Sequence, residues 1–247
     1  MDVADYKKIR PLFDDVDYVF HLAAESRIQP AILNPSLAVQ TNVLGTATVL
    51  QCAREAKVKK VIYSSTSSGY GLINIPPLVE TMPDDCLNPY SVSKVAGEKL
   101  CKMYTDLFEL PTLVFRYFNI YGPREPSKGP YAPVVKLFLR QYAAGEALTI
   151  VGDGLQRRDF THVNDVVDAN ILAMDSDQTG LFNIGTGKNH SVIELANMIS
   201  TNITYIPARP GEARITLADN TKAQTLLGWR SKNTLNDYVT NQLKDIK

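Results

Sequence analysis

The sequence predicts an α/β protein with a parallel sheet that helices cover on both faces. In the first half of the 247 residues, apolar runs of strand length alternate three times with amphipathic stretches of helix length. Parallel strands need a crossover connection, usually a helix, and strands buried on both faces are apolar throughout rather than alternating. Small or polar residues follow each run, where the carboxyl ends of such strands would meet.

The first strand is expected at Asp17–Ala24, after a short helix over residues 6–13, and it ends in Leu22, Ala23 and Ala24. Small residues at the carboxyl end of a parallel strand let a ligand approach the backbone closely. This is the edge at which open α/β sheets bind their ligands. Small residues that only let the next loop pack would explain this segment equally well.

A long helix is expected over Asn34–Ala56, with a polar amide and a glycine in its middle, at Asn42 and Gly45. Glycine there costs about 1 kcal/mol relative to alanine, so close packing or a ligand is expected at this point. The second strand starts at Val61 and ends in the hydroxyl side chains of Ser64–Ser68, which could donate to a ligand oxygen. A serine-rich turn closed by glycines is the alternative.

A helix is expected from Pro89 to about Phe108, because proline suits the first helical position and an apolar face follows it. Tyr90 and Lys94 lie four residues apart on this helix, one above the other, so that Lys94 can reach beneath the Tyr90 ring. An ammonium near a phenol lowers the pKa of the phenol and makes a base that works near neutral pH. Alone, this spacing is a weak signal, and an ordinary amphipathic helix with a surface Tyr and Lys is the alternative.

The pattern changes after the third strand, Thr112–Asn119, where a proline-rich loop begins. We expect further helices near residues 134–144, 164–174, 191–200, 222–227 and 235–246, and strands at 148–151, 181–184 and 203–206. Ser191 and Glu194 form a capping-box pattern at the start of one of these helices. The predicted units are residues 1–119 and 120–247, and the strand at 181–184 is expected to return to the first unit.

Composition disfavours several classes of function. Lys and Arg total 26 and so do Asp and Glu, so the net charge is zero and no nucleic-acid or anionic-membrane partner is expected. No apolar run reaches the length of a membrane span, and the first residues show no signal-peptide pattern. The 3 cysteines and 3 histidines are scattered, so we expect reduced thiols, a cytoplasmic protein and no metal site.

Together these segments resemble the extended short-chain dehydrogenase/reductases, and among them the nucleotide-sugar epimerases of the UDP-glucose/UDP-N-acetylglucosamine 4-epimerase type. The resemblance starts at Asp2 and rests on eight blocks in the family's order, which together are far more specific than any one of them. The blocks are His21–Ala24, Asn42–Thr46, Ser64–Gly71, Tyr90–Lys94, Arg116–Arg124, Arg158–Asp165, Asn183–Gly187 and Arg209–Glu212. The resemblance implies a Rossmann-like doubly wound sheet, a smaller α/β substrate-binding unit, and a homodimer formed through the helices Asn34–Ala56 and Tyr90–Phe108.

The sequence departs from the family at its start, because it holds no Gly-x-Gly-x-x-Gly segment to carry a cofactor pyrophosphate. The resemblance places the first residues at the end of the third strand of the dinucleotide fold. Roughly 50–60 residues of the family pattern, a βαβ unit and part of the next, then have no counterpart. Either the sequence is a fragment of a full enzyme or the protein is short. We expect the fragment, because a short protein would leave a central strand as an exposed edge.

The resemblance also implies the chemistry. Tyr90 would take the proton of the sugar C4 hydroxyl, with its pKa lowered by Lys94 and by the nicotinamide charge, and Thr66 would hydrogen-bond the same hydroxyl. NAD would take the C4 hydride and return it to the other face of the sugar. The cofactor contacts of the family fall on Asp2, Val3, Leu22, Ala23, Ala24, Asn42, Ser64, Tyr90, Lys94 and Tyr117.

The substrate that the resemblance implies is a UDP-sugar. Its contacts fall on Thr66, Asn119, Val134, Arg158, Arg209, Glu212 and Thr216. The small Thr216, where glucose-only epimerases often hold a large aromatic residue, favours UDP-N-acetylhexosamines as well as UDP-hexoses. Ser67 and Ser68 stand where dehydratases carry an acid and a base, which disfavours dehydration. A UDP-sugar decarboxylase or dehydratase of the same family and a non-catalytic Rossmann remnant are the alternatives. The retention of the Thr66, Tyr90 and Lys94 set favours the enzyme.

Overall fold

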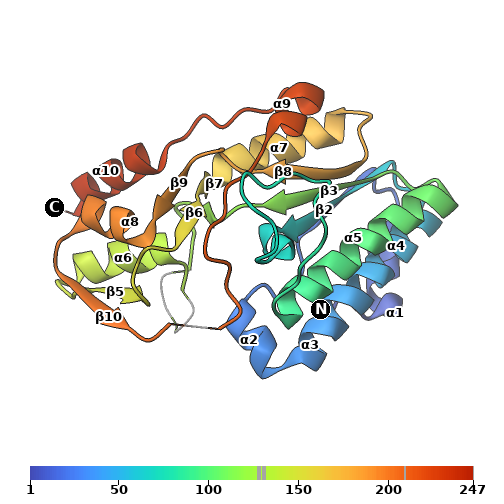
Figure 1. The fold of residues 1–247 in the computed structure, drawn as a ribbon. Helices are drawn as coiled ribbons and strands as arrows, with labels where there is room; N and C mark the ends of the chain where they lie inside the picture. Colours follow the sequence, from blue (N-terminus) through green and yellow to red (C-terminus); the bar gives the residue numbers. More distant parts are fainter. Residues whose placement is uncertain (127–128, 130–131, 209, 247) are drawn as a thin grey trace.

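A four-stranded parallel sheet forms the centre of the computed structural model, which describes residues 1–126, 129, 132–208 and 210–246 (Figure 1). Its strands lie in the order β1 (Tyr18–His21), β2 (Lys60–Thr66), β3 (Thr112–Tyr117) and β8 (Gly180–Ile184). Helical crossovers join them, so the predicted α/β class with a parallel sheet is confirmed.

One face of the sheet is covered by the segments that precede β3 in the chain (Figure 1). These are α1 (Tyr6–Ile9), the 3₁₀ turn η1 (Arg10–Phe13), α4 (Gly45–Glu55) and α5 (Pro89–Phe108). Their buried side chains form one core with alternate residues of the strands, among them Val61 and Tyr63 of β2 and Val114 of β3. This period of two is what a strand buried on both faces requires.

The opposite face is covered by segments from the second half of the chain, α7 (Val163–Asp175) and α9 (Thr221–Leu227) (Figure 1). Their core takes up the intervening strand residues, including Ile62 and Phe115, together with the fully buried Trp229. The sequence anticipated only the strand near 181–184 as a return to the first unit. In the structure, the helices α7 and α9 also pack against the sheet of the first unit.

The long helix expected over Asn34–Ala56 is interrupted. Asn34 caps α3 (Pro35–Val39), and a π-helical turn, η2 (Gln40–Leu44), joins it to α4. A short helix that the sequence did not predict, α2 (Ile28–Leu33), precedes α3. Single π-helical turns inside α-helices are frequent at functional sites, and this one contains Asn42.

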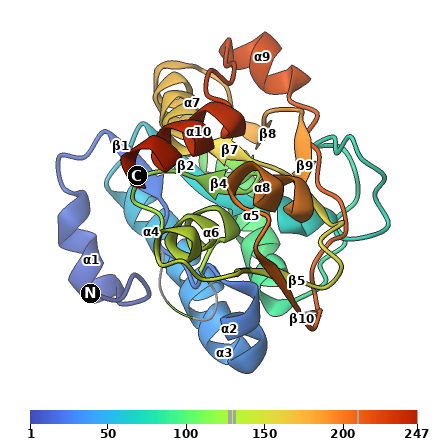
Figure 2. The ribbon, with the colours of Figure 1, turned by 90° about the vertical axis from the view of Figure 1, so that its left-hand side faces the viewer.

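The rest of the second half forms a smaller layer of helices against short strands (Figure 2). α6 (Val134–Ala143), α8 (Val192–Ile199) and α10 (Leu235–Ile246) share a core with β5 (Leu148–Val151), which pairs in parallel with β10 (Ile203–Ile206). The predicted capping box opens α8, where Ser191 accepts from the Glu194 amide and Glu194 accepts from the Ser191 amide.

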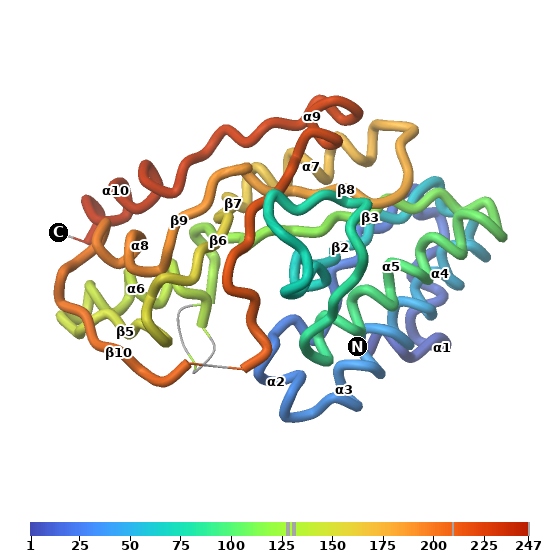
Figure 3. The backbone as a smooth tube through the Cα atoms, in the orientation of Figure 1, coloured from blue at the N-terminus to red at the C-terminus, as the bar shows by residue number. Residues whose placement is uncertain are grey.

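Short strand pairs connect the two parts, and the chain crosses between them several times (Figure 3). β4 (Ile120–Tyr121) pairs with β7 (Thr161–His162), and β6 (Arg157–Asp159) pairs antiparallel with β9 (Asn189–Ser191). The 3₁₀ turn η3 (Ser67–Tyr70) follows β2 directly. Within the described residues, no helix is both long and apolar enough to cross a membrane.

Candidate active site

The main cavity of the described residues lies at the carboxyl ends of β1, β2 and β3 and has a volume of about 580 Å³. This is the edge at which open α/β sheets bind ligands. Most of the residues predicted to bind cofactor or substrate line it together. They are Leu22, Ala24, Ser64, Thr66, Tyr90, Lys94, Tyr117, Asn119, Val134, Arg158 and Glu212.

The helix that carries Tyr90 and Lys94 has a firmly defined start. Asn88 is its N-cap and accepts a hydrogen bond from the Ser91 amide at 2.8 Å, while the Ser91 hydroxyl faces the Asn88 backbone in return. Pro89 occupies the first turn, as its preset φ favours. Tyr90 therefore projects from a fixed helix end into the cavity, next to Thr66 at the end of β2.

Burial has the largest effect on the pKa of the Tyr90 phenol and raises it. Two features oppose this rise: a hydrogen bond with the Thr66 side chain and the positive charge of Arg27. Sequence reasoning found Thr66 but missed Arg27, which also lines the cavity. Arg27 stands in a segment without a motif, at the start of the unpredicted α2, so no local signal pointed to it.

The spacing of the two residues suggested that Lys94 lies beneath the Tyr90 ring, but the structure places it elsewhere. Its ammonium sits over the ring of Tyr63, 4.2 Å from the centroid. The side chain is 3% exposed, and burial lowers the pKa of Lys94 to about 8, opposed by Cys101 and Glu98. A residue four positions along a helix shares the same face, but the facing strand decides which ring the cation meets.

Asn42 is fully buried outside the cavity, where it joins two elements. Its amide nitrogen donates to the Glu25 carbonyl at 3.0 Å and to the Ser93 hydroxyl at 2.8 Å, and its oxygen accepts from the Glu25 amide at 2.8 Å. These bonds fix the loop after β1 against α5. Asn42 can therefore shape a cofactor site by holding the backbone of that loop.

Asp2, Val3 and Ala23 also lie outside the main cavity, and their predicted cofactor contacts stay predictions. Asp2 accepts a hydrogen bond from the Ala4 amide at 2.9 Å. Val3 packs against Gly45, where an added Cβ would lie 2.8 Å from a methyl carbon of Val3. Of the two explanations for this glycine, close packing is the one seen.

The substrate side of the cavity is formed by Asn119, which follows β3, by Arg158 of β6 and by residues of the segment before α9. Asn119 donates to the Thr216 hydroxyl at 3.1 Å, and both line a small adjoining cavity with Arg158 and Glu212. Arg158 lies 3.4 Å from the Glu212 carboxylate, and burial lowers the pKa of Arg158. The predicted site residue Arg209 lies outside the described residues.

A family model described as GDP-mannose 4,6 dehydratase matches residues 1–242. The chain belongs to this family of NAD-dependent epimerases and dehydratases. It is 35% identical over 234 residues to a putative UDP-glucose 4-epimerase of Methanocaldococcus jannaschii, covering 92% of this chain and 76% of that protein. It is also 35% identical over 236 residues to the UDP-glucose 4-epimerase of Mycolicibacterium smegmatis, covering 92% and 75% of the two chains.

Solved structures of this family have the same fold. The UDP-glucose 4-epimerase of Thermotoga maritima with UDP-glucose matches with a TM-score of 0.94 at 33% identity, over 99% of this chain and 82% of that one. The UDP-glucose 4-epimerase of Thermus thermophilus in complex with NAD matches with a TM-score of 0.91 at 28% identity, over 100% and 83%. The Rossmann-like fold predicted from the sequence blocks is thus confirmed.

The residues present fit the nicotinamide and ribose end of NAD. Among the described residues, no oxygen accepts a hydrogen bond from the Lys94 ammonium, which lines the cavity beside Thr66 and Tyr90. An ammonium with three donors suits the two hydroxyls of a ribose. Lys94 and Tyr90, with Ser64 and Tyr117 at neighbouring strand ends, are therefore the residues that would hold this end of the cofactor.

Proposed function

We propose that this protein is an NAD-dependent 4-epimerase of UDP-sugars. The observation that carries the proposal is the convergence of Thr66, Tyr90 and Lys94 on one cavity with the Arg158–Glu212 pair. The first three residues supply a proton acceptor and a cation for a redox step on a hydroxyl-bearing carbon. The last two supply an arginine fork for a pyrophosphate and a carboxylate for ribose hydroxyls.

The chain's residues would share the work as follows. Arg158, Glu212 and Asn119 hold the nucleotide part of the substrate, so that the sugar lies at the Thr66 and Tyr90 hydroxyls. Tyr90 accepts the C4 hydroxyl proton, with Thr66 hydrogen-bonded to the same oxygen, and later returns it. Bound NAD supplies the hydride acceptor and donor at C4. The cation of Arg27 favours the phenolate of Tyr90.

The test is interconversion of UDP-glucose and UDP-galactose by the purified chain with added NAD, followed by the anomeric proton signals in NMR. Tyr90→Phe should lower kcat by about 10²–10⁴-fold, the range of general acid–base catalysis, while binding of UDP stays the same. Retention of wild-type turnover by Tyr90→Phe would contradict the assignment of the base.

A second candidate function is sugar-acid decarboxylation. The chain is 38% identical over 222 residues to a UDP-N-acetyl-alpha-D-glucosaminuronate decarboxylase of Bacillus cytotoxicus, over 84% of this chain and 67% of that protein. Release of carbon dioxide from a UDP-hexuronate, without 4-epimerisation of any UDP-sugar, would favour it. Neutral UDP-sugars that epimerise without loss of carbon favour the epimerase.

For the sugar itself, we propose that N-acetylhexosamines are accepted. Thr216 is small, and its hydroxyl accepts hydrogen bonds from the Asn119 side chain at 3.1 Å and the Asp159 amide at 3.3 Å. Thr216→Tyr should abolish turnover of UDP-N-acetylglucosamine and spare UDP-glucose. Wild-type turnover of UDP-glucose alone would contradict this part of the proposal.

We also propose a homodimer in the cytoplasm. An apolar face crosses α3, η2 and α5, where Leu37, Leu44, Val92 and Leu107 are 40%, 53%, 51% and 68% exposed. A second copy would bury it by helix packing. Leu107→Glu should give a monomer in light scattering after gel filtration. The thiols Cys52, Cys86 and Cys101 are all free, as suits a reducing compartment.

A further inference from the structure

A buried carboxylate lies one helical turn beyond Lys94, where the proposed chemistry does not use it. Glu98 of α5 is 6% exposed, and its Oε1 accepts from the Ser65 hydroxyl at 2.5 Å and from Arg116 Nε at 2.9 Å. Its Oε2 accepts from Arg116 Nη2 at 2.7 Å. Arg116 is itself only 1% exposed, so this is a charge pair almost entirely removed from water.

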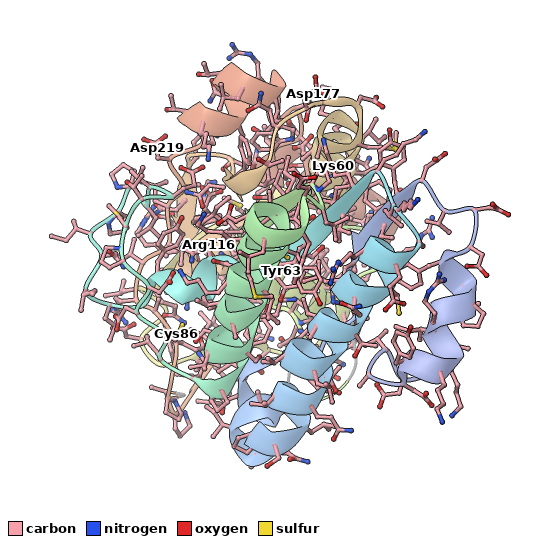
Figure 4. The ribbon with its side chains drawn as sticks, turned by 90° about the vertical axis from the view of Figure 1, so that its right-hand side faces the viewer. Lys60, Tyr63, Cys86, Arg116, Asp177 and Asp219 are labelled. Carbon is pink, nitrogen blue, oxygen red and sulfur yellow. The ribbon has the colours of Figure 1, made fainter. Side chains whose placement is uncertain are left out.

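The three residues belong to the three elements that carry the site. Ser65 on β2 and Arg116 on β3 are register partners in the parallel sheet. Thr66 follows Ser65 directly and Tyr117 follows Arg116. The next residue of each strand therefore lines the cavity. Figure 4 shows Arg116 and Tyr63 lying against α5. Glu98 thus ties both strand ends to the helix that bears Tyr90 and Lys94.

Stability alone does not explain the buried Glu98–Arg116 ion pair. Burying two charges carries a desolvation penalty, and apolar residues of similar size usually serve stability as well or better. Here the pair is extended outward, because Arg116 also bonds Asp84 at 2.5 Å and Asp84 bonds the exposed Lys99 at 2.7 Å. Arg116 Nη1 is buried without a hydrogen-bond partner among the described residues, so the bonds of this network all run through Nε and Nη2. These charge-assisted, directional bonds fix geometry more tightly than apolar contact does.

Glu98 also lies four residues beyond Lys94 on α5, and its carboxylate is one of the groups that raise the pKa of Lys94. The other titratable groups near this ammonium are Cys101 on α5, Tyr63 on β2 and His21 on β1. Burial raises the pKa of Cys101 to about 12 and lowers the pKa of His21 to about 3, and it raises the pKa of Tyr63. All three are therefore neutral at pH 7. Cys101 and Glu98 are the two groups that oppose the fall in the pKa of Lys94, and Glu98 is the carboxylate of the two.

We propose that Glu98, held by Arg116 and Ser65, is a positioning residue that seats α5 on β2 so that Tyr90 and Lys94 meet Thr66. Its carboxylate, one helical turn from Lys94 on the same helix, also favours the ammonium form of Lys94. The kinetic part of this inference rests on the proposed epimerase function. The part that concerns the charge of Lys94 does not.

The test compares Glu98→Gln with Asp106→Asn. Both changes remove one carboxylate charge from α5, but Asp106 is exposed and pairs with Lys102 on the surface. Glu98→Gln should lower kcat at least about ten-fold, since misplacement near 1 Å costs up to about 10²-fold, with KM for the UDP-sugar within about two-fold. Its alkaline limb of kcat should move to lower pH, because Lys94 then loses its proton more readily. Asp106→Asn should match the wild type in all three.

A readout without turnover separates this inference from the epimerase proposal. Titration of ε-¹³C-labelled lysine by NMR, with Lys94 assigned from its loss in Lys94→Met, should show a lower pKa for Lys94 in Glu98→Gln than in Asp106→Asn. If the wild type has no activity, this titration alone decides. An unmoved Lys94 titration, or a wild-type kcat in folded Glu98→Gln, would overturn the inference.

Ser65→Ala covers the case in which Glu98→Gln does not fold. It removes one hydrogen bond and leaves the Glu98–Arg116 pair and its charge. The expected result is a several-fold lower kcat with unchanged KM and an unchanged Lys94 titration. A wild-type kcat for Ser65→Ala would then overturn the positioning role.

Discussion

Gly97→Ala should damage both stability and catalysis, although alanine is the better helix former. An added Cβ at position 97 would lie 2.2 Å from the Tyr63 hydroxyl oxygen and 2.6 Å from Cζ of its ring. These separations are about 1 Å or more shorter than the roughly 3.5 Å at which such atoms pack. Tyr63 cannot yield, because it is fully buried, donates to the Lys94 carbonyl at 3.2 Å and lies under the Lys94 ammonium.

The magnitude follows from two opposing effects. Replacing a helical glycine by alanine contributes about 1 kcal/mol of helix propensity, whereas overpacking in a core costs about 1–3 kcal/mol. The net loss in free energy of unfolding should therefore reach about 2 kcal/mol. Relief of the clash moves α5 off β2 by a distance near 1 Å, and such a displacement of Tyr90 and Lys94 from Thr66 can cost about 10²-fold in kcat.

The assay is urea unfolding combined with kcat, and Gly45→Ala is the matched control for stability. Its added Cβ would meet mainly one methyl carbon of Val3, at 2.8 Å, with the next atom at 3.8 Å. The Val3 side chain is partly exposed and can turn away. Gly45→Ala should thus be neutral or stabilising by up to about 1 kcal/mol. If Gly97→Ala is as stable and as active as the wild type, the reasoning about the Tyr63 contact is wrong.

Two further changes test the charges of the site, and a third tests a buried carboxyl group that does not line its cavities. Arg27→Gln should raise the pKa of Tyr90 and move the rising limb of the kcat profile to higher pH, because the charge of Arg27 lowers that pKa; an unmoved limb would count against this role. Arg158→Lys should raise KM for the UDP-sugar about ten-fold with little change in kcat, since a point charge replaces the planar fork in uniform binding. Burial raises the pKa of Glu125 to about 7, so its neutral form contributes stability that is lost as pH rises through that value. Glu125→Gln should therefore gain stability relative to the wild type between pH 5 and 8, by up to about 3 kcal/mol, in thermal unfolding at each pH.

Most helices and strands could be predicted from the sequence, because each depends on a local pattern of residues. The apolar run at β2, the proline at the start of α5 and the capping box of α8 each specify an element within a few residues. The helix over Asn34–Ala56 was predicted without its π-helical turn. The turn contains Asn42, whose side chain hydrogen-bonds to Glu25 and Ser93 in other parts of the fold. The periodicity of apolar residues within the helix does not encode these tertiary contacts.

The site residues also divide into those whose place is set by local sequence and those whose role is set by tertiary contacts. The sequence by itself determined that Thr66, Tyr90 and Lys94 stand at the ends of elements that meet at one sheet edge, because strand ends and helix starts are set locally. The tertiary structure decided that Lys94 faces Tyr63, that Arg27 bears on Tyr90, and that Glu98 joins two strands. These contacts depend on which distant side chains share a buried space, where desolvation and pairing set the charge of each group, and such pairings leave no signal within one segment.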